Sequence, residues 1–394
     1  MVYRIGNEEI LVVRQKDLSV KAFYNVCPHR GNLLIHLDNG SLDKFKCTYH
    51  GWEFSIDGTL QYVKDSEDFV GENLCGKLTL QELSCEEALG FIWINFDKNC
   101  IPLKEFVYPA IDHLKPYQTE KFIRVLNITA EVNCNWKMLH DNFSETYHVD
   151  TLHPELMTQM DNNYKDSQFD MYKSGVNRML MPGHRPAKNY KKSNDIEFPL
   201  NDVLELWDLD PKKYSGKTSK ARTELQKSKR KLAKDRGYWH YEFLTDEQLT
   251  DYYHYSFFPN FSLTMTPDGF ELLRPQPHPT NPEKCFMEHW YMVPMIEGSL
   301  TGSSTFMDGS NLTDIEEEEL FAETPVGRKP LKNATHEWIN YPDGSLGFII
   351  DQDVSIAETQ QKGVKSRGFK GSILLGQEGR VRRYHELIND YINK

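Results

Sequence analysis

"CPHRGNLLIHLDNGSLDKFKCTYHGW", residues 27–52, decides how the first part of the chain is interpreted. It holds two short knuckles, Cys27-x-His29 and Cys47-x-x-His50. Cysteine and histidine together bind either zinc or an iron–sulfur cluster. A zinc finger usually pairs cysteine with cysteine and histidine with histidine, whereas each knuckle here carries one of each. The pattern therefore favours a two-iron cluster with two cysteines on one iron and two histidines on the other, and a structural zinc is the alternative.

Such a cluster transfers electrons at an unusually high potential. Neutral imidazoles in place of thiolates make it less negative, and its potential rises from about −400 mV to between about −150 and +300 mV. A centre at this potential can accept electrons from a ferredoxin or flavin and pass them to an oxygen-activating metal. Gly31 and Gly51 would let the backbone bend close to the sulfurs, and Trp52 and Phe54 are expected to pack beneath the loops.

Length and composition limit the classes of protein to which the chain can belong. A length of 394 residues predicts two domains, and the net charge of −12 argues against broad affinity for nucleic acid or anionic membrane. No apolar run reaches the length of a membrane span, and the amino terminus lacks a signal-peptide pattern, so we expect a cytoplasmic protein. The seven cysteines make a poor disulfide framework, and the five outside the knuckles are expected to be small buried hydrophobes.

The pattern of strands, turns and charges divides the chain. Residues 1–100 contain short β-like runs separated by turn signals, which predicts a small antiparallel β domain with two protruding loops. Residues 101–122 are expected to be a linker, and residues 123–394 a second domain. A charged insertion at about 185–245 contains a basic helical run that predicts a solvated helix or a mobile segment, with a docking patch for an acidic electron carrier as the alternative. The acidic run at 314–324 predicts a helix.

The second domain contains residues suited to another metal. A non-haem iron(II) that activates O₂ uses two histidines and one carboxylate. His148 and His153 could supply the imidazoles, although such a pair on its own is more often packing or surface. An unbroken helix would hold them about 140° apart, so we expect the helix to distort or end between them, near Asp150-Thr151.

Four segments together carry a resemblance to a known family: "CPHRG", "CTYHGWEFSIDG", "NWKMLHDNFSETYHVDTLH" and "IIDQDVSIAETQQKG". They resemble the terminal oxygenase (α) subunit of Rieske non-haem iron oxygenases, over nearly the whole chain and in the same order. The resemblance implies an α+β fold, with a small antiparallel β Rieske domain and a helix-grip (START-like) catalytic domain whose curved antiparallel sheet grips a long helix. It implies that the [2Fe-2S] ligands are Cys27, His29, Cys47 and His50, and that the mononuclear iron ligands are His148, His153 and Asp353.

The choice of the carboxylate depends on the register of the last segment. Glu358, Gln361 and Gly363 match the family pattern, which selects Asp353 over its neighbour Asp351. The alternative role for Asp353 is a helix N-cap. The residues from Ser355 to Glu358 also have the pattern of a capping box, which marks the start of a helix in this region. His140 falls outside the matched pattern and is expected to be structural or second-sphere.

The resemblance also implies cofactors, partners and a mechanism. NAD(P)H reduces a separate flavin reductase, directly or through a ferredoxin, since this chain has no dinucleotide-binding fingerprint. Single electrons then pass through the Rieske cluster to the iron(II), where oxygen from O₂ is inserted into a small organic substrate. Members of the family usually form rings of three, sometimes with a β subunit, and the electron crosses between subunits. The chain begins almost at the first Rieske strand, whereas relatives usually carry a further amino-terminal segment.

Substrate and pocket are the least determined expectations. An aromatic substrate, hydroxylated or dihydroxylated, is the first choice. A monooxygenase or N-demethylase acting on a quaternary ammonium or methylated compound is the alternative, because Glu145 stands where ring dihydroxylases have aspartate. A non-catalytic electron carrier is the third, disfavoured by the second metal motif. The resemblance implies that Glu145 links a ligand histidine of the iron to a Rieske histidine of the neighbouring subunit, with an ordinary surface or capping glutamate as the alternative. Asn142, Val149 and Ile349 are expected beside the iron.

Overall fold

The computed structural model describes residues 1–192, 194–295 and 333–393. The chain divides into two compact units, Met1–Glu105 and Phe106–Lys394. The acidic run at 314–324, expected to be a helix, lies outside the described residues. Among the helices that are described, none has the length and apolarity that crossing a membrane requires.

The first unit contains two small sheets, and every strand pairing described in them is antiparallel. The larger sheet has the order β1 (Val2–Ile5), β2 (Glu8–Arg14), β3 (Val20–Tyr24), β7 (Glu82–Ala88) and β8 (Phe91–Asn95). The smaller sheet joins β4 (Lys44–Lys46), β5 (Glu53–Ser55) and β6 (Leu60–Tyr62), and the 3₁₀ turn η1 (Ser66–Asp68) follows. The small antiparallel β unit predicted from the sequence is therefore present.

One apolar core of the first unit encloses the two knuckle cysteines. Phe23, Phe54 and Leu60 are fully buried in it, and Cys27 and Cys47 belong to the same cluster. The alternation of strand side chains directs these residues to one side of their sheets. The sulfurs are thereby held at the edge of a packed core.

The second unit is built on a sheet of eight described strands in the order β10-β11-β12-β13-β14-β15-β9-β16. Neighbours are antiparallel except β16, which runs parallel to β9. The sheet is therefore mixed at one edge. The strands are β9 (Phe122–Val132), β10 (Gln168–Met171), β11 (Val176–Met181), β12 (Tyr252–Phe257), β13 (Phe261–Thr266), β14 (Gly269–Pro277), β15 (Cys285–Pro294) and β16 (Glu337–Ile339).

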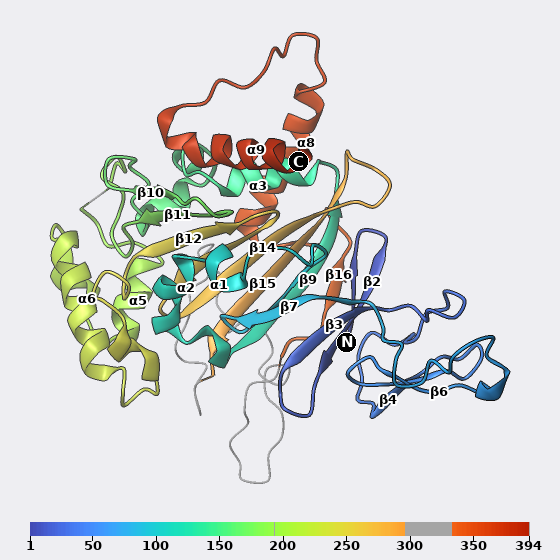
Figure 1. The fold of residues 1–394 in the computed structure, drawn as a ribbon. Coiled ribbons are helices and arrows are strands. Elements are labelled where there is room, and N and C mark those ends of the chain that lie inside the picture. Colours follow the sequence, from blue (N-terminus) through green and yellow to red (C-terminus); the bar gives the residue numbers. More distant parts are fainter. Residues whose placement is uncertain (193, 296–332, 394) are drawn as a thin grey trace. The chain divides into compact units, whose positions relative to one another are not determined.

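Helices cover one face of this sheet. Leu139 and Phe143 of α3 and Ile350 and Val354 of α8 pack on alternate residues of β9 and β15. In Figure 1, α9 lies beside α3, and the ring of Tyr384 stacks on that of His140 at 3.6 Å. The helices and 3₁₀ turns are α2 (Ala110–Leu114), η2 (Lys115–Tyr117), η3 (Thr119–Lys121), α3 (Trp136–Phe143), α4 (Val149–Leu152), η4 (Pro154–Thr158), α5 (Leu200–Leu206), η5 (Pro211–Tyr214), α6 (Thr218–Leu232), η6 (Trp239–Phe243), α8 (Phe348–Gly363), η8 (Gly376–Glu378) and α9 (Gly379–Ile392).

Two expectations about connecting segments are corrected. Residues 101–122 are not a plain linker: they form α1 (Leu103–Phe106) and further helical turns, and Val107 and Leu114 are fully buried. The basic run forms the helix α6, as expected, but this helix is not solvated on every side. Its Lys229 is fully buried and donates to Asp268 at 2.9 Å. A basic sequence pattern does not reveal a buried ion pair, because the burial of a side chain depends on residues that are distant in the chain.

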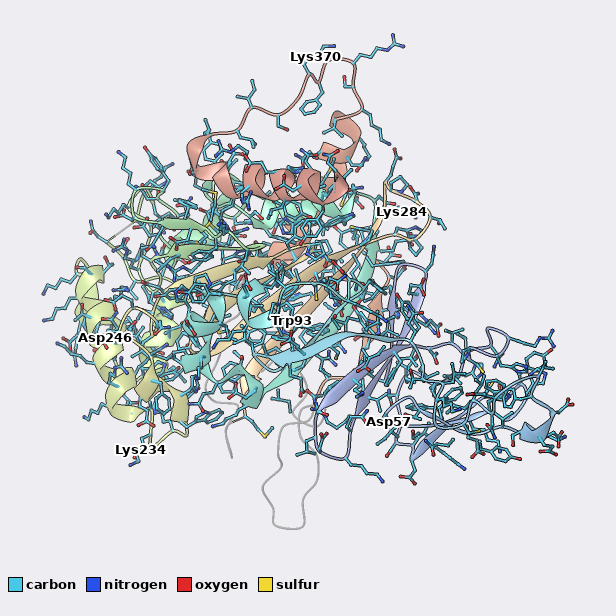
Figure 2. All side chains as sticks on the ribbon, in the orientation of Figure 1. Asp57, Trp93, Lys234, Asp246, Lys284 and Lys370 are labelled. Carbon is cyan, nitrogen blue, oxygen red and sulfur yellow. The ribbon has the colours of Figure 1, made fainter. Side chains whose placement is uncertain are left out.

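The remaining surface of α6 keeps the solvated character that the sequence predicted. Lys234, just beyond the helix, is exposed and extends away from the fold (Figure 2). Among the five cysteines outside the knuckles, Cys134 and Cys285 are buried as expected. The other three are partly exposed, against expectation, and all seven are free thiols: Cys27, Cys47, Cys75, Cys85, Cys100, Cys134 and Cys285.

Candidate metal centres and active site

The two knuckles of the first unit have the same backbone geometry. The N–H of Gly31 donates to the carbonyl of Cys27 at 2.9 Å, and the N–H of Gly51 donates to that of Cys47 at 3.0 Å. Gly31 and Gly51 have φ values of +76° and +73°, a region that residues with a Cβ rarely adopt. Each knuckle therefore closes into a tight turn with its cysteine at the start, as the glycines predicted.

The four side chains of the knuckles lie together. The rings of His29 and His50 are 4.6 Å apart, and His29 stacks on Trp52 at 4.6 Å. Cys27 and Cys47 lie close enough for each to affect the pKa of the other, and Sγ of Cys47 accepts from the side-chain amide of Asn32 at 3.8 Å. The structure therefore brings the two sulfurs and the two imidazoles into one compact group, as the spacing of these residues predicted.

Burial and backbone donors shift the pKa values of the two knuckle cysteines in opposite directions. Burial raises the pKa of the Cys27 thiol to about 11. Burial also acts to raise that of Cys47, but N–H donors from Tyr49 and His50 outweigh it, so its pKa is lowered. Nδ1 of His50 is buried with no hydrogen-bond partner among the described residues. Two buried thiols, two neighbouring imidazole rings and an imidazole nitrogen without a described partner fit a [2Fe-2S] cluster, whose thiolate and imidazole ligands these residues would provide.

The second candidate site begins where the chain leaves β9. Asn135 caps α3, its side chain accepting from the N–H of Lys137 at 3.1 Å. The helix ends at Phe143, and after a turn the short helix α4 occupies Val149–Leu152. His148 and His153 therefore flank a single helical turn instead of sharing a long helix. The break expected near Asp150-Thr151 is wrong, because these two residues lie inside α4. The chain instead departs from helical geometry before His148 and at His153, and the two histidines still reach a common point.

Three side chains converge at this point. His148, His153 and Asp353 each offer a ligand atom, and these atoms all lie within 4.8 Å of one another. Oδ1 of Asp353 is 2.8 Å from Nε2 of His153 and 3.5 Å from Nε2 of His148. His153 and Asp353 are buried, and His148 is partly buried. Two histidines and one carboxylate on one side of a common point match the donor set for non-haem iron(II).

The other nitrogen of each imidazole fixes its tautomer. Nδ1 of His148 is 2.6 Å from Oε1 of Glu145, and Nδ1 of His153 is 2.5 Å from Oε1 of Gln352. Carboxylate and amide oxygens only accept, so both Nδ1 atoms carry the proton. The Nε2 lone pairs then point at the Asp353 carboxylate, which is also an acceptor. Facing acceptors are stable only with a positive charge between them, and the residues therefore fit a metal ion.

Glu145 also governs the affinity of His148 for protons. Burial lowers the pKa of His148, but the bond and the charge of Glu145, together with Asp353, outweigh burial and leave that pKa raised. The carboxylate itself is anchored by backbone, since its Oε2 accepts from the N–H groups of Tyr147 and His148. Glu145 is therefore held in place within its own turn, with one oxygen aimed at the histidine.

The long helix α8 determines which aspartate reaches the histidines. It begins after Gly347, so Asp353 lies in its second turn and is not an N-cap, and Ser355 and Glu358 lie inside the helix without forming a capping box. Asp351 instead bonds the hydroxyl of Ser345 at 2.5 Å at the start of the helix. The structure thus brings Asp353, and not Asp351, to the two imidazoles.

The same helix is tied to the segment that precedes α3. Glu358 accepts from the N–H of Asn133 at 2.8 Å, and Gln361 accepts from that of Asn135 at 2.9 Å. Asn142, in the last turn of α3, donates to Oδ1 of Asp353 at 2.7 Å. These bonds hold the two parts of the metal site in register.

The expected pocket residues have different surroundings. Asn142 contacts the ligand carboxylate directly. Val149 and Ile349 are buried together against Met179 and Tyr252 of the sheet. Because Val149 follows His148 and Ile349 precedes Asp353 by one helical turn, this apolar cluster borders the three ligands. That these three residues contact a substrate stays a prediction.

Sequence reasoning missed one residue of this site, Gln352, and a buried arginine on which the charge of Glu145 acts, Arg380. Gln352 was overlooked because a glutamine beside a ligand carries no signal of its own, although its neighbour Asp353 could have drawn attention to it. Arg380 of α9 is fully buried and donates to Nδ1 of His254 at 2.9 Å and to the hydroxyl of Ser256 at 2.8 Å. Burial lowers the pKa of this guanidinium to about 9. His140, expected to be structural or second-sphere, is buried beside it, and burial lowers its pKa to about 3.

Comparison with family models supports the same division of the chain. Residues 119–394 match the family described as the ring hydroxylating α subunit (catalytic domain). Residues 1–72 match the Rieske [2Fe-2S] domain. The two matches contain all seven of the residues grouped above into two ligand sets.

Two kinds of curated relatives match part of the chain. The large oxygenase component of the naphthalene 1,2-dioxygenase system of Pseudomonas putida is 36% identical over 156 residues, which are 38% of this chain and 35% of that protein. The carnitine monooxygenase oxygenase subunit of Acinetobacter pittii (strain PHEA-2) is 34% identical over 158 residues, 38% of this chain and 41% of that protein. The matches thus span well under half the length of these relatives.

Solved structures share the fold over almost all of the chain. A quaternary ammonium Rieske monooxygenase aligns with a TM-score of 0.63 at 18% identity, covering 99% of this chain and 84% of that one. Naphthalene 1,2-dioxygenase with indole bound aligns with a TM-score of 0.61 at 20% identity, covering 100% and 83%. At these identities the likeness concerns the fold.

Proposed function

The chain belongs to the family of ring-hydroxylating α subunits, with a Rieske domain and a catalytic domain, and from this premise we propose that it is the terminal oxygenase of a Rieske system. The observation that carries the proposal is the presence of two separate ligand sets in one chain, a Cys₂His₂ group and a His₂Asp group. An electron carrier would need only the first set. The second set leaves coordination positions for O₂ and is therefore the mark of an oxygenase.

The two groups supply the chemistry, and the residues of the chain hold and orient them. When bound, a Rieske cluster supplies one-electron transfer and the mononuclear iron(II) supplies the centre for O₂. Cys27, Cys47, His29 and His50 would hold the cluster, and His148, His153 and Asp353 the iron. Glu145 and Gln352 keep the Nδ1 protons of the two ligand histidines in place, so that Nε2 stays free to coordinate.

Glu145 is proposed to have a second role between subunits. Its Oε1 already accepts from His148, and a carboxylate oxygen has a further lone pair. The resemblance to the family supports a second hydrogen bond from a Rieske histidine, His29 or His50, of a neighbouring copy. Glu145 would then link the two metal centres of a ring, and the homotrimer expected from the sequence would be needed for electron transfer.

Domain roles and partners follow the same proposal. Residues up to about Glu105 form the Rieske unit and the remainder the catalytic unit, a boundary close to the one expected at residue 100. The electrons would come from NAD(P)H through a separate flavin reductase, with or without a ferredoxin. A β subunit and a cytoplasmic location stay predictions.

Two substrate classes are proposed. An aromatic ring, hydroxylated or dihydroxylated, is supported by the likeness to the naphthalene dioxygenase component. A quaternary ammonium or methylated compound, oxidised by one oxygen atom or demethylated, is supported by the carnitine monooxygenase subunit and by the glutamate at position 145.

The test is substrate-dependent O₂ uptake. Protein reconstituted with iron and sulfide is combined with NADH and a surrogate reductase and ferredoxin, and products are identified by mass. Uptake that depends on a substrate and yields an oxygenated product supports the proposal. The Asp353→Ala variant should keep the Rieske spectrum and lose this uptake. A protein that is reduced by the reductase but never consumes O₂ with any substrate would instead be an electron carrier.

A further inference from the structure

The sheet face that supports the iron site carries an isolated carboxylate. Strand register aligns Met179, His254, Thr264, Glu271 and Tyr291 in one row across β11 to β15. Residues in one such row project from the same face of a sheet. Farther along the sheet this face packs against α3 and α8 through apolar side chains. A glutamate in the middle of such a covered face requires an explanation.

Glu271 lies on the part of the face that borders the metal ligands. Met179, at the end of the same row, packs with Val149 and Ile349, which flank His148 and Asp353 in the chain. Leu273, the next residue of β14 on this face, packs on α3 and α8. The side chain of Glu271 nevertheless remains 14% exposed. Part of the Glu271 side chain is therefore open to its surroundings.

The only described ion-pair partner of Glu271 is an imidazole that points its lone pair at the carboxylate. Nδ1 of His289 lies 2.8 Å from the carbonyl oxygen of Leu346, just before α8. A carbonyl only accepts, so Nδ1 carries the proton of the neutral ring. Nε2 then faces Oε1 of Glu271 at 3.1 Å as a second acceptor. The two acceptors are stable together only with a proton or another positive charge beside them.

Aromatic rings complete the surroundings. Tyr291 stands directly opposite Glu271 across the β14–β15 pair and is buried. Tyr252 projects from the same face and packs in the cluster of Val149 and Ile349. A carboxylate with a tyrosine directly opposite it is suited to an alkylammonium group, because the face of an aromatic ring and a carboxylate both attract a cation that cannot donate strong hydrogen bonds.

We propose that Glu271, positioned by His289 and flanked by Tyr291, is the residue that selects an alkylammonium substrate for the iron site. The inference rests on the proposed function and names the substrate class within it. The charge of the cation would be balanced by the Glu271 carboxylate, which His289 holds in place. A neutral aromatic hydrocarbon would leave the carboxylate without a partner, so the same residue would discriminate against it.

The test measures binding in the absence of turnover. Iron-loaded wild-type protein is titrated anaerobically by calorimetry with choline, glycine betaine and carnitine, each against an analogue in which carbon replaces the quaternary nitrogen. We expect at least one cation to bind about tenfold or more tightly than its neutral analogue. In Glu271→Gln that preference should fall to near unity, with affinity for the neutral analogue unchanged.

Two further variants serve as a second test and as a control. Glu271→Met fills a similar space with an apolar chain and should favour the neutral analogue, which keeps the test valid if the glutamine variant folds poorly. Glu131→Gln, on an exposed position of β9, is the matched control and should keep the preference of the wild type. Iron content and thermal unfolding are measured for every variant.

The outcomes separate this inference from the proposed function. Equal affinity of the wild type for every cation and its analogue, no cation binding at all, or an unchanged preference in both Glu271 variants overturns the selection by Glu271. Oxygen uptake with an aromatic compound would still uphold the oxygenase in that case. Conversely, cation binding that depends on Glu271, with no O₂ uptake on any substrate, would uphold the binding site and overturn the oxygenase.

Discussion

Nε2 of His153 lies 2.8 Å from Oδ1 of Asp353, although the two residues are 200 positions apart in the chain. The proton on Nδ1 of His153 is committed to Gln352, the residue directly before Asp353. One turn of α8 therefore supplies both a ligand and the group that orients another ligand. Since the facing atoms are both acceptors, the metal ion is what makes this pair stable.

The first prediction concerns metal content. Reconstituted wild-type protein should contain about three irons and about two acid-labile sulfides per chain, in line with a two-iron cluster and one further iron. Asp353→Ala or His153→Ala should lose about one iron and keep the sulfide, because the cluster ligands lie in the other unit. Asp351→Ala is the control and should keep all the iron. Zinc without labile sulfide would contradict the assignment of the first site.

Gln352 gives a prediction that only the structure suggests. Gln352→Leu should lower iron affinity about 10- to 100-fold, because His153 loses the acceptor that fixes its ring. The measurement is iron retention against a graded series of chelator concentrations. Gln360→Leu changes an exposed glutamine of the same helix and should retain iron as the wild type does. Equal retention in both variants would show that His153 needs no such support.

The proposed link through Glu145 can be tested in a single turnover. Pre-reduced protein is mixed with substrate and O₂, and reoxidation of the Rieske centre is followed by absorbance. Glu145→Gln should slow it about tenfold or more and Glu145→Ala further, with iron content largely retained. Asp150→Asn, an exposed acid of the adjacent turn, should behave as the wild type. Reoxidation at the normal rate in Glu145→Ala would remove the link from the mechanism.

Ile349 is expected to shape the space beside the iron. Ile349→Ala should cost about 2–5 kcal/mol of stability as a buried truncation, and it should also change the ratio of products formed from a given substrate. Val354→Ala is the matched control, since that residue is buried in the same helix but packs in the cluster away from Val149. If the two variants lose similar stability and neither changes the products, Ile349 is core alone.

The carboxyl-terminal helix predicts a pH dependence. Nε2 of His385 in α9 is 2.8 Å from Oδ2 of Asp141 in α3, and this bond raises the pKa of His385. Burial raises the pKa of Asp141 against the lowering effect of His385. A raised histidine pKa stabilises the fold fully below about pH 6.5, the unfolded value, and this stabilisation is lost as the pH rises through the folded value.

His385→Gln should therefore be less stable than the wild type near pH 6 and equally stable near pH 9. The difference should stay below about 1 kcal/mol, because the imidazole is almost half exposed. Denaturant unfolding across this range measures it. A difference of the same size at every pH would mean that packing, and not the charge of His385, accounts for the effect.

Much of the fold could be predicted because its signals are local. The Rieske ligands fall within 24 consecutive residues, and two glycines mark the turns that place them. The alternation of apolar residues in the strands predicted antiparallel β structure. The spacing of His148 and His153 showed that one long helix could not hold both, but the break was expected at Asp150-Thr151, which lie inside α4. These are properties of short segments, for which covalent geometry and side-chain period decide the outcome.

The site was predictable only as far as it matched a known pattern. The register of one helix favoured Asp353 over Asp351, and the structure shows why: Asp351 is used at the start of α8. The linker at 101–122 and the solvated basic helix were misjudged, because burial of Leu114 or Lys229 depends on partners distant in the chain. The proline and charge content of a segment does not show which distant residues will pack against it.

The sequence by itself determined the classes of ligand, the order of the two domains and the strands that form them. Tertiary structure alone decided that Gln352 orients His153 and that Arg380 is buried. It also decided that α3 and α8 pack on the sheet face that carries Leu273 and Glu271. The physical reason is that a strand's period assigns a residue to one of two faces without saying which face a helix covers. That choice is made when α3 and α8 pack on the sheet, through contacts between segments up to hundreds of residues apart.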